Sequence, residues 1–185
     1  MRAAVLEAAI IELTKTGYAA LTVERVAQRA GVHKTTIYRN WKDSDGLLVD
    51  ALISHFAMDI PIPDTGAVES DLRALARSLV VTMTTSAGRA LLTAVLSDAV
   101  RLPQLADVKH ALFDDRFRRA ESVVTRAVQR GELPADTAPA ELLKALAAPI
   151  YFRLVFTGEP VDEATADRAV GIALAAAHAH VLTPM

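Results

Sequence analysis

Apolar residues recur along the whole chain at the three-to-four-residue spacing of helices, and no stretch shows the sustained alternation of a β-strand. In the first stretch Leu6, Ala9, Ile10 and Leu13 form one apolar stripe, and Gly17 follows where a helix would end. The pattern therefore predicts an all-α protein whose first helix ends at Gly17.

Two short helices are predicted next, with a glycine between them. Thr22 is a suitable N-cap for a helix that runs to Ala30, because its hydroxyl can accept from an N–H of the first turn. Gly31 provides the turn, and a second helix is predicted from about Val32 to Trp41. Two helices joined in this way form a helix-turn-helix.

The second of these helices has an apolar side and a polar, basic side. Ile37 and Trp41 are four residues apart and share a face, so they can pack against the preceding helix. The other sides carry short hydroxyls, an amphipathic aromatic ring and cations, which suit phosphates and base edges in the major groove of DNA. The alternative is a solvated basic helix packed against its neighbour. The candidate DNA-binding residues are Thr22, His33, Lys34, Thr35, Thr36, Tyr38, Arg39, Asn40 and Lys42.

The distribution of charge supports the DNA interpretation, although the chain as a whole is acidic. The net charge is −2, yet five cations and no acid lie between Arg25 and Lys42, both included. A local basic patch can attract a polyanion to one face of such a protein.

The remaining pattern predicts a larger helical part. A helix begins near Asp45, and the polar, basic character stops after the proline-rich segment 61–66. Further helices are predicted at 67–85, 88–100, 104–130, 139–157 and from Asp162 to about Leu182. Pro149 lies inside one of them and predicts a kink. We place a helix-turn-helix domain at residues 1–45 and a larger helical domain at residues 46–185.

Composition restricts the class of protein further. With 185 residues, 52% of them apolar, the chain can fold around a real core. The absence of cysteine excludes disulfides and thiolate metal sites and suits the cytoplasm. No apolar run reaches about 18 residues, so no membrane span is expected. The start, MRAAVLEAA, carries charge early and lacks a long apolar core, so we expect a cytoplasmic protein without a signal peptide.

The segment VLEAAIIELTKTGYAALTVERVAQRAGVHKTTIYRNWKDSDGLL resembles the N-terminal domain of the tetracycline-repressor (TetR) family of bacterial transcription regulators. The likeness lies in GY, LTV, VAQRAGV, TTIYRNW and LL, which come in the family's order and spacing. The second half is similar to a subset of the family through GRALLTAVLSDAVRLPQLA and YFRLVFTGEPVDEA. The resemblance implies an N-terminal three-helix DNA-binding domain, joined to a larger helical domain that binds a small-molecule effector and dimerises. It implies a homodimeric repressor that binds a pseudo-palindromic operator.

Two positions depart from the family's pattern. Ser44 stands where the family usually has a lysine that opens the fourth helix and holds a phosphate, and Lys42 is the expected substitute. His33 stands where the recognition helix often has a capping serine. A histidine caps less well, so we expect His33 to contact DNA instead.

Aromatic residues of the second half raise the question of an effector pocket. Phe113 and Phe117 share a helix face, and so do Phe152 and Phe156. They either pack in the core or line an apolar pocket with polar groups at its edge. The resemblance favours a pocket in this region and leaves its ligand open. The candidate pocket residues are Phe113, Arg116, Phe117, Tyr151, Phe152 and Phe156.

The last two helices are apolar on nearly all sides. In a monomer they would expose a large apolar patch, so we expect them to pair with a twofold copy, where small residues let backbones approach closely. The alternative is a final helix buried wholly within one subunit. The candidate interface residues are Leu146, Ile150, Ala166, Ala169, Ala173, Ala176 and His180.

Enzyme chemistry has little support in the sequence. His178 and His180 are two residues apart on a helix and point in different directions, and His55 with Asp59 reads better as a surface pair than as a metal site. None of the motifs G-x-S-x-G, H-E-x-x-H or a phosphate-binding loop is present. We predict no catalytic residue, metal or cofactor. The alternatives to an effector-released repressor are a regulator whose second domain only dimerises, and an enzyme built on the helical domain.

Overall fold

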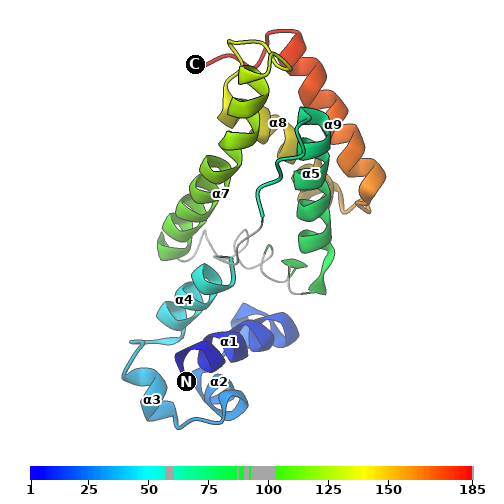
Figure 1. The fold of residues 1–185 in the computed structure, drawn as a ribbon. Coiled ribbons are helices and arrows are strands. Elements are labelled where there is room, and N and C mark those ends of the chain that lie inside the picture. The colour runs from blue at the N-terminus through cyan, green and yellow to red at the C-terminus, as the bar shows by residue number, and fades with distance from the viewer. Residues whose placement is uncertain (57–60, 87, 90–91, 93–102, 185) are drawn as a thin grey trace. The chain divides into compact units, whose positions relative to one another are not determined.

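The computed structural model describes residues 1–56, 61–86, 88–89, 92 and 103–184, and every regular element among them is a helix (Figure 1). The predicted all-α fold class is confirmed. The chain forms two compact units. One comprises Met1–Asp59 with Thr85–Phe113, and the other comprises Ile60–Thr84 with Asp114–Met185.

The described residues 1–56 of the first unit form four α-helices and one short 3-10 turn. They are α1 (Arg2–Thr16), η1 (Tyr18–Ala20), α2 (Val23–Ala30), α3 (Lys34–Tyr38) and α4 (Ser44–Phe56). Helix α1 packs against both α2 and α4, and α2 packs against α3. The predicted stripe on α1 is buried, and Ile37 and Trp41 are buried with it. The helix-turn-helix therefore folds around a core of its own.

Helix α4 begins at Ser44, next to the Asp45 at which the sequence predicts its start. Asp43 is the cap: its Oδ1 accepts a 2.8 Å hydrogen bond from the Gly46 N–H. Asp45 lies in the first turn and accepts a 2.9 Å hydrogen bond from the Tyr18 hydroxyl. The predicted division of the chain after residue 45 stays a prediction; α4 itself packs on α1 in the first unit.

Four α-helices and a π-helical turn contribute to the second unit. They are α5 (Val68–Thr84), α7 (Pro103–Gln129), α8 (Pro139–Phe152), η2 (Arg153–Thr157) and α9 (Glu163–His178). Helix α9 packs against α5 and α8, and α7 adds Val123, Val124 and Ala127 to the same core. The helix predicted at 88–100 lies largely outside the described residues.

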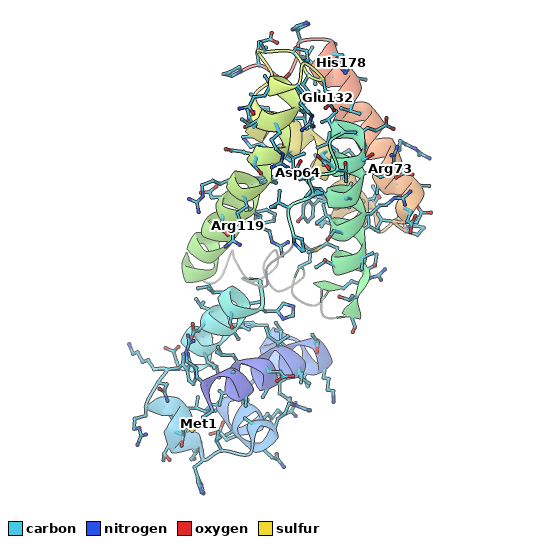
Figure 2. All side chains as sticks on the ribbon, viewed as in Figure 1. Met1, Asp64, Arg73, Arg119, Glu132 and His178 are labelled. Atoms are coloured by element: carbon cyan, nitrogen blue, oxygen red, sulfur yellow. The ribbon has the colours of Figure 1, made fainter. Side chains whose placement is uncertain are left out.

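Polar contacts hold the segment that precedes α5 against the end of α7. The Glu132 carboxylate accepts from the Val68 N–H, and Arg126 forms a 3.2 Å ion pair with Asp64. Figure 2 labels Glu132 and Asp64 in this part of the second unit. An acid at the first turn of α5 also suits the positive end of that helix.

The two ends of α9 are fixed in different ways. Asp162 is its N-cap, as predicted: the Asp162 carboxylate accepts from the Thr165 N–H at 2.8 Å in a capping box. The helix ends at His178, earlier than expected, because His180 adopts a positive φ of 57° and turns the chain. The Leu182 carbonyl then accepts a 2.7 Å hydrogen bond from the Ala138 N–H, at the start of α8.

Candidate nucleic-acid interface

The turn between α2 and α3 is built as its sequence requires. Gly31 has φ 65° and ψ 32°, a left-handed conformation that glycine adopts without a steric penalty. The Val32 N–H reaches back to the Ala27 carbonyl at 3.0 Å and so closes the end of α2. At the other end, the Thr22 hydroxyl accepts from the Arg25 N–H at 3.3 Å, which confirms Thr22 as the N-cap.

Helix α3 presents one apolar residue inward and its polar residues outward. Ile37 is fully buried, whereas Lys34, Thr35 and Tyr38 are exposed. Of the nine candidate DNA-binding residues, eight are exposed and one, Thr36, is half-buried. All nine lie on α3, on its flanking residues or at the start of α2, so the fold brings them into the same helix-turn-helix.

Some of these side chains already have partners within the unit. The Asn40 amide donates a 2.7 Å hydrogen bond to the Thr36 carbonyl, at the end of α3. The Lys34 ammonium lies 3.9 Å from the Glu24 carboxylate, with both side chains more than 60% exposed. An exposed pair at that distance contributes little, so Lys34 can turn to another anion at small cost. His33 occupies the N-cap position of α3 without a side-chain capping bond, and its ring is exposed.

Two carboxylates outside the predicted DNA-binding set hold α3 and α2 in place. Asp50 on α4 accepts from the Trp41 indole N–H at 2.8 Å and from the Arg2 guanidinium at 2.7 Å. Glu12 on α1 is buried and pairs with Arg29 on α2. Neither is recognisable from helical periodicity, because an acid on a buried face looks like an interruption of the pattern until its partner from another helix is known.

Known protein families match the chain over both of its halves. Residues 5–51 match the bacterial regulatory proteins of the tetR family, and residues 62–173 match the tetracyclin repressor-like C-terminal domain. The chain belongs to the TetR family. The predicted family, fold class and function as a DNA-binding transcriptional regulator are therefore confirmed.

Individual relatives agree over nearly the full chain. The HTH-type transcriptional regulator AqdR of Rhodococcus erythropolis is 30% identical over 175 residues, which are 94% of this chain and 83% of AqdR. The DNA-binding transcriptional repressor TetR of Mycobacteroides abscessus is 33% identical, over 91% of this chain and 88% of that repressor. Among solved structures, the TetR family regulator SCO0332 is 33% identical with a TM-score of 0.75, covering 94% of this chain and 96% of that one.

The residues predicted for an effector pocket lie in different environments. Phe117 packs against the core of the second unit, and Tyr151 is partly buried. Burial raises the pKa of the Tyr151 phenol, an effect that the charge of Arg116 opposes. Phe113 and Arg116 are half-buried on α7. Phe152 and Phe156 are instead 57% and 76% exposed, and their rings stack with centroids 5.5 Å apart. The pocket stays a prediction, and these two rings do not enclose one.

The residues predicted for the dimer interface need a correction. Those with less than 5% of their surface exposed form part of the second unit's own core; they are Leu146, Ile150, Ala166, Ala169 and Ala173. The alternative of a final helix buried within one subunit therefore holds for this side of α9. Ala176 is half-buried, and His180 is exposed, with its Nδ1 2.9 Å from the Asp136 carboxylate. The exposed side of α9 carries Ile172 instead, at 50% exposure.

Two further observations bear on the remaining expectations. In the described part of the chain, no group of three or more histidine and acidic side chains is placed to hold a metal ion. Asp59, the expected surface partner of His55, lies outside the described residues. No helix in the same part of the chain is long and apolar enough to span a membrane.

Proposed function

We propose that this TetR-family regulator is a homodimeric repressor that uses α3 as its recognition helix and leaves its operator when a small molecule binds the second unit. The observation that carries the proposal is the two-sidedness of α3. Its apolar residue Ile37 is buried, while Lys34, Thr35, Tyr38 and Arg39 are exposed together. Cations and a phenol suit phosphate contacts, and hydroxyls suit base edges. The relative from Mycobacteroides abscessus, named a DNA-binding transcriptional repressor, supports repression.

Dimerisation follows from the geometry of operator binding. One helix-turn-helix reads only a few base pairs, and two copies about 34 Å apart read a pseudo-palindrome. We place the interface on exposed parts of α8 and α9, where Ile172 lies among the small residues Gly171 and Ala175. Small side chains allow two helices to approach closely. A DNA partner also implies a cytoplasmic protein, and no catalytic role is part of the proposal.

Selection of bound sequences from a random pool of duplex DNA tests the DNA-binding part. We expect a sequence with two related half-sites, bound with an affinity that falls steeply as salt increases. Variants Arg39→Ala and Tyr38→Ala should each weaken binding. If both bind the selected operator as the parent does, α3 is not the recognition helix.

A regulator without an effector is the second candidate, and one observation favours it. Phe152 and Phe156 stack on the surface of the second unit, so two of the six predicted pocket residues are available to solvent and not enclosed. A thermal-shift screen with metabolite mixtures, followed by competition against the bound operator, separates the two candidates. A compound that raises Tm and releases the operator supports the effector-released repressor. If no mixture does either, the second unit serves dimerisation alone.

A further inference from the structure

Asp50 connects three separate segments of the first unit. It lies on α4, where Oδ2 accepts from the Trp41 indole N–H at 2.8 Å. Both carboxylate oxygens also lie 2.7 Å from the Arg2 guanidinium, at the start of α1. Helices α1 and α4 pack on one another (Figure 1). Trp41 lies three residues after Tyr38, the last residue of α3.

Trp41 is the residue through which this contact reaches α3. The Trp41 backbone N–H donates to the Ile37 carbonyl at 2.9 Å, so the backbone at Trp41 is bonded to the last turn of α3. The ring is 8% exposed, and a buried indole N–H costs free energy unless it has an acceptor. Asp50 supplies that acceptor and thereby fixes the orientation of the ring.

Helix α3 depends on such an anchor because it is very short. It has five residues, far fewer than the 12 or so that an isolated helix needs to be even marginally stable. Two side chains, Ile37 and Trp41, attach it and the turn after it to the core. The direction of its exposed side chains therefore depends on how firmly these two are held.

We propose that Asp50 is a positioning residue for DNA recognition: its carboxylate orients Trp41 and so aligns α3, while Arg2 holds the carboxylate in place. The inference rests on the proposed role of α3 as the recognition helix. Asp50 itself contributes a negative charge to a unit that must approach phosphates. The Arg2 Nη2 donates to both carboxylate oxygens, and the positive charge of Arg2 offsets the negative charge of Asp50.

Trp41 also provides the readout, because it is the single tryptophan of the chain. Its fluorescence is measured on the full-length protein without DNA, as emission maximum and acrylamide quenching. In Asp50→Ala the indole loses its acceptor, so we expect red-shifted emission and stronger quenching. In Asp50→Asn the amide oxygen can still accept, so the parent spectrum should be retained. Arg2→Gln is the control for loss of the charge pair alone and should change the spectrum less than Asp50→Ala.

Operator affinity is then measured for the same variants. Loss of a hydrogen bond to a charged acceptor should lower affinity roughly tenfold in Asp50→Ala, with recovery in Asp50→Asn. Trp41→Phe removes the donor, so Asp50→Ala in that background should cause little further loss. The inference is overturned if Asp50→Ala leaves the fluorescence unchanged, or if its effect on affinity is just as large when Trp41 is already phenylalanine.

The same data separate this inference from the proposed function. If Asp50→Ala shifts the fluorescence but not the affinity, Arg39→Ala decides between two failures. A loss of binding in Arg39→Ala means that α3 contacts DNA and that Asp50 does not position it. Unchanged binding in both Arg39→Ala and Tyr38→Ala means that α3 is not the DNA-binding helix, and both ideas fall. If Asp50→Ala does not fold, two other variants test the inference: Trp41→Phe must weaken operator binding and Asp50→Asn must retain it. Unchanged binding in Trp41→Phe together with weakened binding in Asp50→Asn overturns the inference.

Discussion

The Arg29 guanidinium of α2 lies 2.5 Å from the Glu12 carboxylate of α1, and the two side chains differ greatly in exposure. Glu12 is 7% exposed, whereas Arg29 is 32% exposed. A buried carboxylate that loses its partner remains desolvated and unpaired, while a half-exposed guanidinium can turn to water. Removing Arg29 and removing Glu12 should therefore lower the free energy of unfolding by different amounts.

We predict that Arg29→Ala destabilises the first unit more than Glu12→Ala does. Arg29→Ala should lower the free energy of unfolding by about 1.5–3 kcal/mol, the usual range for a hydrogen bond to a charged group left unsatisfied. Urea unfolding followed by Trp41 fluorescence measures this unit specifically. Glu7→Ala, an exposed acid on the same helix, is the control and should be nearly neutral. Equal costs for the two deletions would contradict the asymmetry.

A second prediction concerns Lys42, in the segment between α3 and α4. Lys42 is exposed and is the proposed substitute for the phosphate-binding lysine that Ser44 replaces. Lys42→Ala should weaken binding to all DNA sequences and reduce the slope of log affinity against log salt by about one. Binding that keeps the parent's salt slope would mean that Lys42 contacts no phosphate.

Substitution of the neighbouring Asp43 should have the opposite effect on DNA affinity. Its Oδ1 caps α4, but its charge also lies next to Lys42. Asp43→Ser keeps a capping oxygen and removes the charge, so DNA affinity should rise by roughly twofold to fivefold, within the range of exposed charge interactions. Asp43→Ala is the control: it removes the charge and the cap together, and the lost cap should cost about 1 kcal/mol of stability. A fall in affinity for Asp43→Ser would contradict this account.

Local sequence signals predicted the helix-turn-helix well because its determinants are local. The cap at Thr22, the left-handed Gly31 and the burial of Ile37 each depend on residues within a few positions along the chain. The contacts of Asp50 and Glu12 could not be predicted in this way. Each joins residues that are 9 to 48 positions apart in sequence, and no spacing rule identifies which donor meets which carboxylate.

The second unit shows a different limit of the sequence. Apolar residues on nearly all sides of α9 indicated a buried helix, and the structure buries one side of it, including Ala166 and Ala173. Periodicity cannot distinguish burial inside a subunit from burial between subunits, because both remove the same side chains from water. The three-dimensional packing on α5 and α8 makes that distinction.

A fourth prediction concerns the stability of the second unit at low pH. Asp167 on α9 accepts from Arg77 on α5 at 3.0 and 2.8 Å, and Arg73 lies 3.3 Å away. These contacts, the hydrogen bond from Arg77 above all, hold the pKa of Asp167 below its ordinary value of 3.8. As the pH falls, the Asp167 carboxylate therefore takes up a proton at a higher pH in the unfolded chain than in the folded chain. Its stabilising contribution is therefore complete well above pH 3.8 and is lost as the pH falls through the lower, folded pKa.

Asp167→Asn tests this linkage. Between pH 6 and about 3, the Tm of the variant should fall less than the Tm of the parent, because one of the carboxylates linked to acid unfolding is gone. The difference should be modest, since both partners are more than a third exposed and screened by water. Asp114→Asn, an exposed acid on α7, is the control and should follow the parent. Parallel Tm curves for Asp167→Asn and the parent would refute the linkage.

The last prediction distinguishes the core side of α9 from its outer side. The adjacent residues Ala173 and Ile172 lie on these two sides. Ala173 has no exposed surface, so Ala173→Glu would place a carboxylate in the core and should unfold the second unit instead of only splitting a dimer. Ile172 is 50% exposed, so Ile172→Glu should keep the parent's helical circular-dichroism spectrum and yield a monomer. Val81→Glu is the matched control, since Val81 is a 63% exposed apolar residue on α5, outside the proposed interface, and this variant should remain dimeric. Sedimentation at micromolar concentration gives the oligomeric state. Operator binding should be lost with the dimer, because a monomer contacts only one of the two half-sites. An Ile172→Glu protein that still sediments as a dimer would move the interface away from this side of α9.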